Sequence, residues 1–153
     1  MVKPAFNVPP EGVFWPHTWV VADDVIISLT QEGPVPDENW DHFVEDILRD
    51  STHRMLGIGI GSINVHSRQR RKLVQAMHDK RIAAVLGSSV ARGIATALGW
   101  MGLKIRGFGW NDIDTAFEYL GSEHIDIEAG VGLVSQLLAR SGAPTLEELL
   151  KDT

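Results

Sequence analysis

Glycines recur at every second position in two short apolar stretches of the sequence. Gly57, Gly59 and Gly61 alternate with large apolar residues, and Gly107 and Gly109 flank a phenylalanine. Glycine-rich turns can cradle phosphates, but a dinucleotide fingerprint needs G-x-G-x-x-G spacing and a P-loop needs a lysine. The alternation instead predicts strands with one bare face, which a helix or a partner can approach closely. If these strands are neighbours, Gly57, Gly59, Gly107 and Gly109 could line one shallow ligand groove.

Two serines and an arginine stand at the start of a predicted helix. Ser88 or Ser89 can cap this helix, and Arg92 follows about one turn later. Free backbone N–H groups, two hydroxyls and a guanidinium together suit an anion or a phosphate. The alternative is a capped helix whose arginine pairs with a carboxylate such as Asp112 or Asp114. The sequence leaves both interpretations open.

The sequence lacks three patterns that usually accompany catalysis or metal binding. It has no cysteine, its six histidines show neither H-x-x-x-H nor H-E-x-x-H spacing, and no serine stands in G-x-S-x-G. Nucleophilic catalysis and zinc binding need such groups close together. We therefore predict no catalytic residue, no metal site and no cofactor, in a domain that is not an enzyme.

Charge and composition limit the classes of partner. The 153 residues suit one domain, and 44% hydrophobic with 22% charged residues is ordinary for globular proteins. A net charge of −6 argues against a nucleic-acid binder, whose affinity would come from neutralising phosphates. The start of the chain lacks the apolar core of a signal peptide, and no apolar run approaches membrane-spanning length. We expect a cytoplasmic protein without a membrane span.

One basic cluster interrupts this acidic background. It could receive an acidic partner or a nucleotide, or it could be the solvated face of a helix, balanced by carboxylates such as Asp46. No aromatic residue interleaves the cluster, which argues against single-stranded nucleic acid. Its members are His66, Arg68, Arg70, Arg71 and Lys72.

Five tryptophans are many for a chain of this length. Trp100 lies beside the main apolar stripe of its predicted helix, and Trp110 follows a strand with bare positions. Phe14 and Trp15 belong to a segment that holds four of the seven prolines. Tryptophan is enriched at protein interfaces. We predict a contact surface formed by Phe14, Trp15, Trp100 and Trp110, and a homo-oligomer.

A strand–helix–strand unit at 81–109 organises the rest of the chain. The apolar run 82–86 is too short for a helix and predicts a strand. Apolar residues at helical spacing predict a helix over 90–101, and 104–108 predicts a second strand. Two strands joined by such a helix form a parallel, right-handed crossover. Because this helix is apolar nearly all round, we expect it to be covered on more than one side.

The other elements extend this unit. Runs 19–21 and 25–29 predict a hairpin. Asp37 caps a helix with one apolar face. Further elements are expected at 55–61 (strand), 64–80 (helix), 111–121 (helix), 125–139 (helix interrupted by Gly130 and Gly132) and from Thr145 (short helix with a capping box).

This order predicts an α/β fold with a single mixed, mainly parallel sheet of about 4–5 strands and helices packed on it. Residues 1–18 form an extended, proline-rich N-terminal arm, which cannot pair as a central strand. Residues 19–121 form the α/β domain, and residues 122–153 form a C-terminal helical extension.

The stretch GSSVARGIATALGWMGLKIRGF, followed by NDIDTAFEYLG, resembles a run in the STAS superfamily, in particular its SpoIIAA-like and SEC14-like small bacterial domains. The detailed likeness covers residues 80–121, and the order of elements extends it to 19–121. In STAS regulators the phosphorylated residue lies in an Asp-Ser-Ser/Thr-Gly turn before the second helix, where this chain has Gly61-Ser62-Ile63-Asn64. Gly87-Ser88-Ser89 is more similar to that motif but comes one strand–helix unit later.

The resemblance implies a non-catalytic regulatory or scaffolding domain that acts through protein–protein contacts. Ser62, Ser88 and Ser89 are the candidate switch points, because a phosphate at a helix start meets free N–H groups. The alternative is a small-molecule binding domain that takes a lipid or a nucleotide over the glycines, with Arg92 closing the groove.

Overall fold

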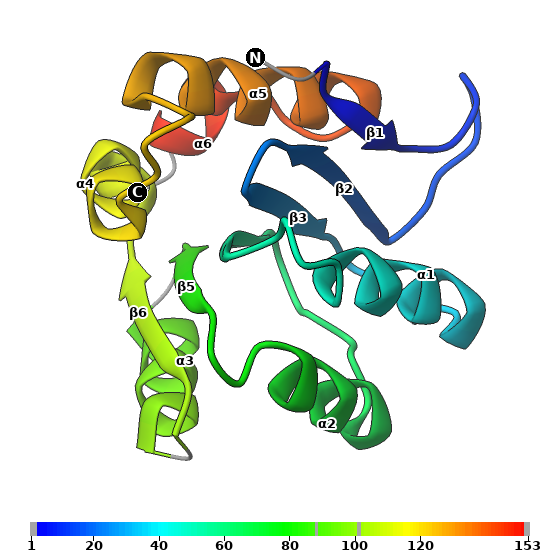
Figure 1. Ribbon diagram of the computed structural model, residues 1–153. Coiled ribbons are helices and arrows are strands. Elements are labelled where there is room, and N and C mark those ends of the chain that lie inside the picture. The colour runs from blue at the N-terminus through cyan, green and yellow to red at the C-terminus, as the bar shows by residue number, and fades with distance from the viewer. Residues whose placement is uncertain (1–2, 88, 101, 152–153) are drawn as a thin grey trace.

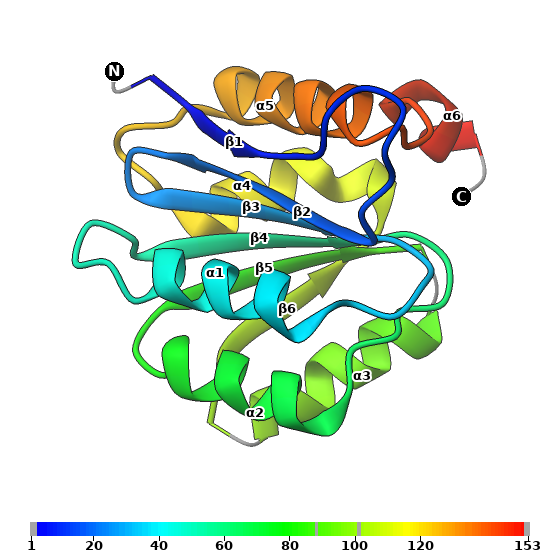
Figure 2. The same cartoon turned by 90° about the vertical axis from the view of Figure 1, so that its right-hand side faces the viewer.

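The computed structural model describes residues 3–87, 89–100 and 102–151; the side chains at 90, 91, 94, 97, 98 and 100 also lie outside this description. One mixed sheet forms the centre of the molecule, with its strands in sequence order (Figure 2). The first three strands are antiparallel, and the third to sixth are parallel. The strands are β1 (Ala5–Asn7), β2 (His17–Ala22), β3 (Val25–Thr30), β4 (Arg54–Gly59), β5 (Arg81–Leu86) and β6 (Lys104–Phe108).

Helices cover both faces of the sheet. Right-handed crossovers that step from strand to adjacent strand in one direction place all their helices on the same face. This rule accounts for α1 (Asp37–Ile47), α2 (Ser67–Ala76) and α3 (Ser89–Trp100), which share one face, with α2 between the other two (Figure 1). The opposite face carries a 3-10 helix (Trp110–Asp112), α4 (Ile113–Leu120), α5 (Ile127–Arg140) and α6 (Leu146–Lys151).

The expectation of an α/β fold with a mixed sheet is confirmed, but the sheet has six strands rather than 4–5. The additional strand, β1, comes from the proline-rich arm and pairs only with β2. An edge position suits it, because prolines flank it at Pro4 and Pro9 and cannot donate to a ladder. Because β1 and β2 are both antiparallel to their neighbours, only the β3 to β6 part of the sheet is parallel.

The strand–helix–strand unit is confirmed, with β5 and β6 parallel neighbours joined by α3. The expectation that α3 is covered on more than one side is wrong for one of its faces. Ser89, Gly93 and Thr96 follow each other along the helix and are exposed. The reason is the position of α3 at the end of the sheet, above the edge strand β6, where no further crossover helix follows.

Within the C-terminal segment 122–153, the described residues 122–151 complete the core on the second face of the sheet. Leu133, Val134 and Leu137 of α5 are buried in the same apolar cluster as Val20 of β2 and Leu56 of β4. Helix α5 runs unbroken through both of its glycines. The capping box at Thr145 is confirmed, since the Glu148 backbone N–H donates to the Thr145 hydroxyl at 3.2 Å.

Candidate functional site

A row of small residues crosses the sheet on the face that α1, α2 and α3 cover. Ser28, Gly57, Ala84 and Gly107 are register partners on β3, β4, β5 and β6. Register partners point to the same face of a sheet. The three helices therefore lie over a strip where strand side chains fill little of the space.

A cavity of about 190 Å³ lies over this row. Its volume is close to that of an engineered apolar cavity of about 150 Å³ that holds benzene in another protein. Apart from Ser28, Thr30 and Arg70, the described lining residues are apolar or glycine. It includes Ser28, Thr30, Trp40, Phe43, Met55, Gly57, Ile58, Gly59, Ile63, Val65, Arg70, Leu73, Ile82, Ala84, Leu86, Ala95, Leu103 and Ile105.

Solvent reaches the floor of this cavity. Gly57 stands in the middle of β4, a strand with neighbours on both sides, yet it is only half-buried. A Cβ atom added at Gly57 would meet one described atom within 4 Å, the Met55 Cε at 3.8 Å. At Gly59 the added atom would lie 2.4 Å from the Ile63 Cδ1, so Ile63 fills the space there. Ile63 is itself 45% exposed and marks the rim.

The other predicted pair of glycines lies under α3. A Cβ atom at Gly107 would lie 3.4 Å from the Cβ and Cγ of Arg92, and one at Gly109 would lie 3.2 Å from its Nη1. The bare face of β6 therefore accommodates the side chain of Arg92. Gly57 and Gly59 do not form one groove with Gly107 and Gly109, because α3 lies on β6.

Arg92 borders a separate hollow at the carboxyl end of β6. The hollow has a volume of about 580 Å³, and Arg106, Asn111 and Asp112 contribute to its lining. The predicted ion pair of Arg92 with Asp112 or Asp114 does not form in the described part of the chain. Because the lining mixes arginines with a carboxylate, its charge does not select an anion.

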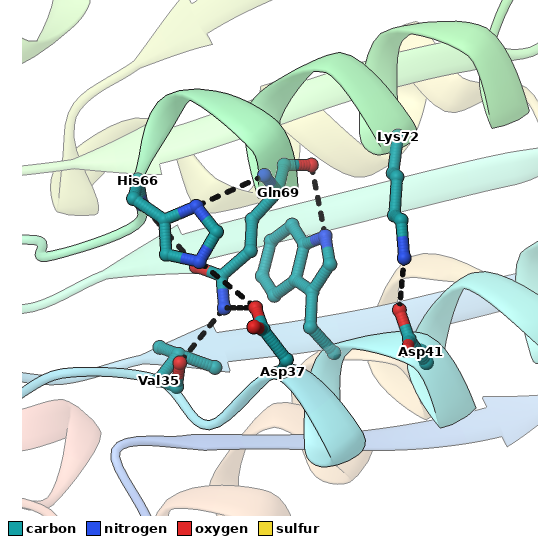
Figure 3. Close-up of polar contacts among 7 residues, drawn as sticks. Val35, Asp37, Asp41, His66, Gln69 and Lys72 are labelled. Atoms are coloured by element: carbon teal, nitrogen blue, oxygen red, sulfur yellow. Dashed lines mark hydrogen bonds and ion pairs between the residues drawn. The ribbon is translucent and has the colours of Figure 1, made fainter.

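Gln69 bonds α2 to α1 and to the loop before it. The side chain of Gln69, 1% exposed, donates from Nε2 to the Val35 carbonyl at 2.7 Å and to the Asp37 Oδ1 at 3.1 Å (Figure 3). The Trp40 indole N–H donates to the Gln69 carbonyl at 2.9 Å. Buried polar groups need such partners. These bonds hold α2 over the cavity. No spacing in the sequence indicates them, because the partners are about thirty positions apart.

His66 closes the same contact at the start of α2. Its Nδ1 accepts the Gln69 backbone N–H at 3.4 Å, so its Nε2 carries the proton donated to the Asp37 Oδ1 at 2.8 Å (Figure 3). Gln69 completes a capping box by accepting the His66 backbone N–H. The hydrogen bond from His66 lowers the pKa of Asp37.

The members of the basic cluster differ in their partners. Lys72 pairs with Asp41 of α1 at 2.6 Å. Asp46, expected to balance the cluster, instead pairs with Arg49 at 3.0 Å and accepts the Trp19 indole N–H. The remaining arginines of the helix are exposed and make no ion pair with any described residue; they are Arg68, Arg70 and Arg71.

A buried histidine lies next to the cavity wall. His17 is completely buried and contacts the rings of Trp19, Trp40 and Phe43, with centroids 5.2, 4.9 and 4.4 Å away. Its Nδ1 donates to the Asn39 Oδ1 at 2.9 Å, because the Asn39 amide nitrogen faces the His17 carbonyl, and its Nε2 accepts from the Ser28 hydroxyl at 3.0 Å. Burial lowers the pKa of His17 to about 4.

The candidate switch serines lie in different settings, Ser62 in the loop before α2 and Ser89 at the start of α3. Ser62 is exposed in the turn after β4, and its backbone N–H donates to the Glu32 Oε1 at 3.3 Å. Ser89 is exposed at the first position of α3. Ser88 lies outside the described residues. The two described hydroxyls are therefore accessible to a kinase, and neither lines the apolar cavity.

The predicted contact residues are not on one surface. Phe14 is 54% exposed and Trp15 is half-buried, and both border a hollow of about 570 Å³ beside α1. Trp110 lies in the core with 3% of its surface exposed, so in this fold it offers almost nothing to a partner. The side chain of Trp100 lies outside the described residues.

The described residues offer neither a cluster of metal ligands nor a membrane-spanning helix. Within 3–87, 89–100 and 102–151, no three histidine, aspartate or glutamate side chains gather as metal ligands would. No helix in that part of the chain has the length and apolar character to cross a bilayer.

Comparison with known proteins found no match to a family model, to a curated protein or to a solved structure.

Proposed function

We propose that this protein is a non-catalytic binding domain that takes a small apolar molecule into the cavity between α2 and the sheet. The observation that carries the proposal is solvent access to Gly57, in the middle of a central strand and beneath three helices. Apolar surface that water can reach gains free energy when a ligand covers it, about 25 cal/mol per Å². A mainly apolar pocket with few polar groups is the usual form of a small-molecule site.

Thermal unfolding with 1-octanol as a neutral probe tests this proposal. A ligand that binds only the folded state at ten times its Kd stabilises it by about 1.4 kcal/mol, which raises the Tm by a few degrees. Ala84→Leu places three more carbon atoms in the cavity, and we expect it to abolish the shift. Ala5→Leu makes the same change on the exposed edge strand β1 and should leave the shift intact.

Gly57→Ala is a milder version of the same test, in case Ala84→Leu does not fold. Its new methyl group fits without a clash and narrows the cavity, so the shift should become smaller. An unchanged Tm of the natural protein with 1-octanol would overturn the proposal. An equal shift in the natural protein, Ala84→Leu and Gly57→Ala would also overturn it, because the probe would then bind elsewhere.

A second candidate function is a regulatory or scaffolding contact made by the N-terminal arm, with a second copy of the chain as the partner. Val13 and Phe14 are 51% and 54% exposed, and they are consecutive on a loop that borders an aromatic hollow. The resemblance of residues 19–121 to STAS domains supports a regulatory role, and phosphorylation of the exposed Ser62 or Ser89 is its proposed switch.

Light scattering tests the second candidate. We expect a dimer for the natural chain and a monomer for Phe14→Ser. Leu48→Ser is the matched control, because Leu48 is a 60% exposed apolar residue on another part of the surface. A natural chain that stays monomeric at high concentration would contradict self-association. Mass spectrometry after incubation with cell extract and ATP would contradict the switch if it finds phosphate on neither serine.

A further inference from the structure

Arg70 is the one charged residue in the described lining of the cavity. It is exposed, as is Ile63, so both lie where the cavity meets solvent. Leu73 follows three positions later on α2 and also lines the cavity. Residues three apart share a helix face, so Arg70 and Leu73 present a charge and an apolar side chain to the same opening.

The arginine at this opening has no ion-pair partner among the residues that the structure describes. No carboxylate belongs to the described lining, and Arg70 forms no ion pair with a described residue. Arg68 and Arg71 of the same helix also form no ion pair with a described residue, although the charge of Arg68 acts on Asp37, in a protein whose net charge is −6. The mouth of the cavity is thus locally positive on an acidic molecule, and such a field favours an anion.

The volume of the cavity limits the size of the apolar part of a ligand. The cavity has a volume of about 190 Å³. One water molecule occupies about 30 Å³ in the liquid, and one methylene group occupies a similar volume. The cavity therefore holds roughly six methylene groups. A branched lipid with two long chains does not fit, whereas a single chain of medium length does.

We infer that the ligand is a free medium-chain carboxylate, whose chain fills the cavity and whose carboxylate binds Arg70 at the mouth. This inference rests on the proposed function and names its ligand class. The chain would cover Gly57 and Ala84, and the carboxylate would stay partly in water. A guanidinium binds a carboxylate through two parallel hydrogen bonds, which a neutral alcohol cannot reproduce.

Calorimetric titration with octanoate and with 1-octanol separates the charge from the chain. We expect octanoate to bind the natural protein about fivefold more tightly than 1-octanol, since a partly exposed charged pair contributes modestly. Arg70→Gln should remove this advantage and leave the affinity for 1-octanol unchanged. Arg68→Gln, which removes an equally exposed arginine outside the lining, should change neither affinity. Raising the salt concentration from about 0.05 M to about 0.5 M should weaken the binding of octanoate and leave the binding of 1-octanol unchanged.

Each result either supports or overturns the inference. Equal affinity for the two probes, or an octanoate advantage that survives Arg70→Gln, would overturn it while the proposed function stands. Binding of neither probe would overturn the proposed function as well. Sedimentation with phosphatidylglycerol vesicles adds the test of a lipid headgroup as the source of the anion. One further result would overturn the inference: the protein binds the vesicles but not free octanoate, and Arg68→Gln and Arg70→Gln weaken vesicle binding equally. The arginines would then be assigned to contact with a membrane surface.

Discussion

Gly130 and Gly132 stand two positions apart in helix α5 but have different surroundings. A Cβ atom at Gly130 would lie 2.4 Å from the Cε1 of Phe117, a buried ring of α4. At Gly132 the added atom would meet no described atom within 4 Å. Gly130 therefore allows α4 and α5 to approach each other closely, whereas Gly132 has no such role.

Alanine substitutions at these two positions should have opposite effects. Gly132→Ala should raise the free energy of unfolding by up to about 1 kcal/mol, the helix propensity difference between the residues. Gly130→Ala gains the same propensity but forces the Phe117 ring to move, so we expect a net loss of about 1–2 kcal/mol. Urea denaturation of both variants measures the difference. Equal stabilisation by both would contradict the close packing of α5 on Phe117.

Single residues also show what a sequence can predict. The alternation correctly placed Gly57, Gly59 and Gly107 on strands, because the side-chain period of a strand is two, whereas Gly109 follows the end of β6 and precedes the 3-10 helix. It could not show that Arg92 lies on one pair and a cavity over the other. That difference depends on where α2 and α3 lie above the sheet, which no local spacing records.

At the scale of elements, local chemistry located most of the secondary structure. Short apolar runs located β4, β5 and β6, and the capping box located α6. The limits of α2 were less well predicted, because a helix was expected over 64–80 and the structure has Ser67–Ala76. His66 begins this helix by accepting the Gln69 N–H, a role that serine, threonine, aspartate or asparagine usually fills.

The attachment of α2 explains why the cavity was not predictable from the sequence. Helix α2 contacts α1 through polar groups at Asp37, Asp41, Gln69 and Lys72, while its apolar Leu73 faces the cavity. The apolar pattern indicated which side of the helix is buried. It did not indicate that hydrogen bonds to α1 hold the start of the helix, while Ala76 at its end packs with Met55 and Ile82 of the sheet.

At the scale of the whole molecule, the sequence predicted one α/β domain, and the segments on either side of it were underestimated. The arm supplies the edge strand β1, and residues from 122 onward bury the second face of the sheet. Proline content and the glycines of α5 concealed these roles, because both residue types weaken the local signal for a strand or a helix. Membership of the STAS superfamily stays a prediction.

The stability of the whole molecule should depend on pH through His17, which links β2 to β3 by way of Ser28 and to α1 by way of Asn39. Burial among uncharged groups lowers its pKa to about 4 from an ordinary value of about 6.5. Between these two values the unfolded chain binds a proton that the folded chain does not. The free energy of unfolding should therefore fall as the pH drops from about 6.5 to about 4, by up to about 3 kcal/mol.

Urea denaturation at pH 7 and at pH 5 measures this loss, and His17→Gln, which cannot titrate, is the comparison. The variant should have a lower free energy of unfolding at pH 7, since it loses the ring contacts. Between pH 7 and pH 5 its free energy of unfolding should fall by about 1–2 kcal/mol less than that of the natural protein, because this is the part of the His17 effect that falls between these pH values. If the variant does not fold, nuclear magnetic resonance of the His17 ring in the natural protein provides the same test. Ring signals that titrate near pH 6.5 in the folded chain would show that His17 is not held neutral by burial. If the free energy of unfolding depends on pH equally in the natural protein and in His17→Gln, the loss of stability in acid comes from other groups.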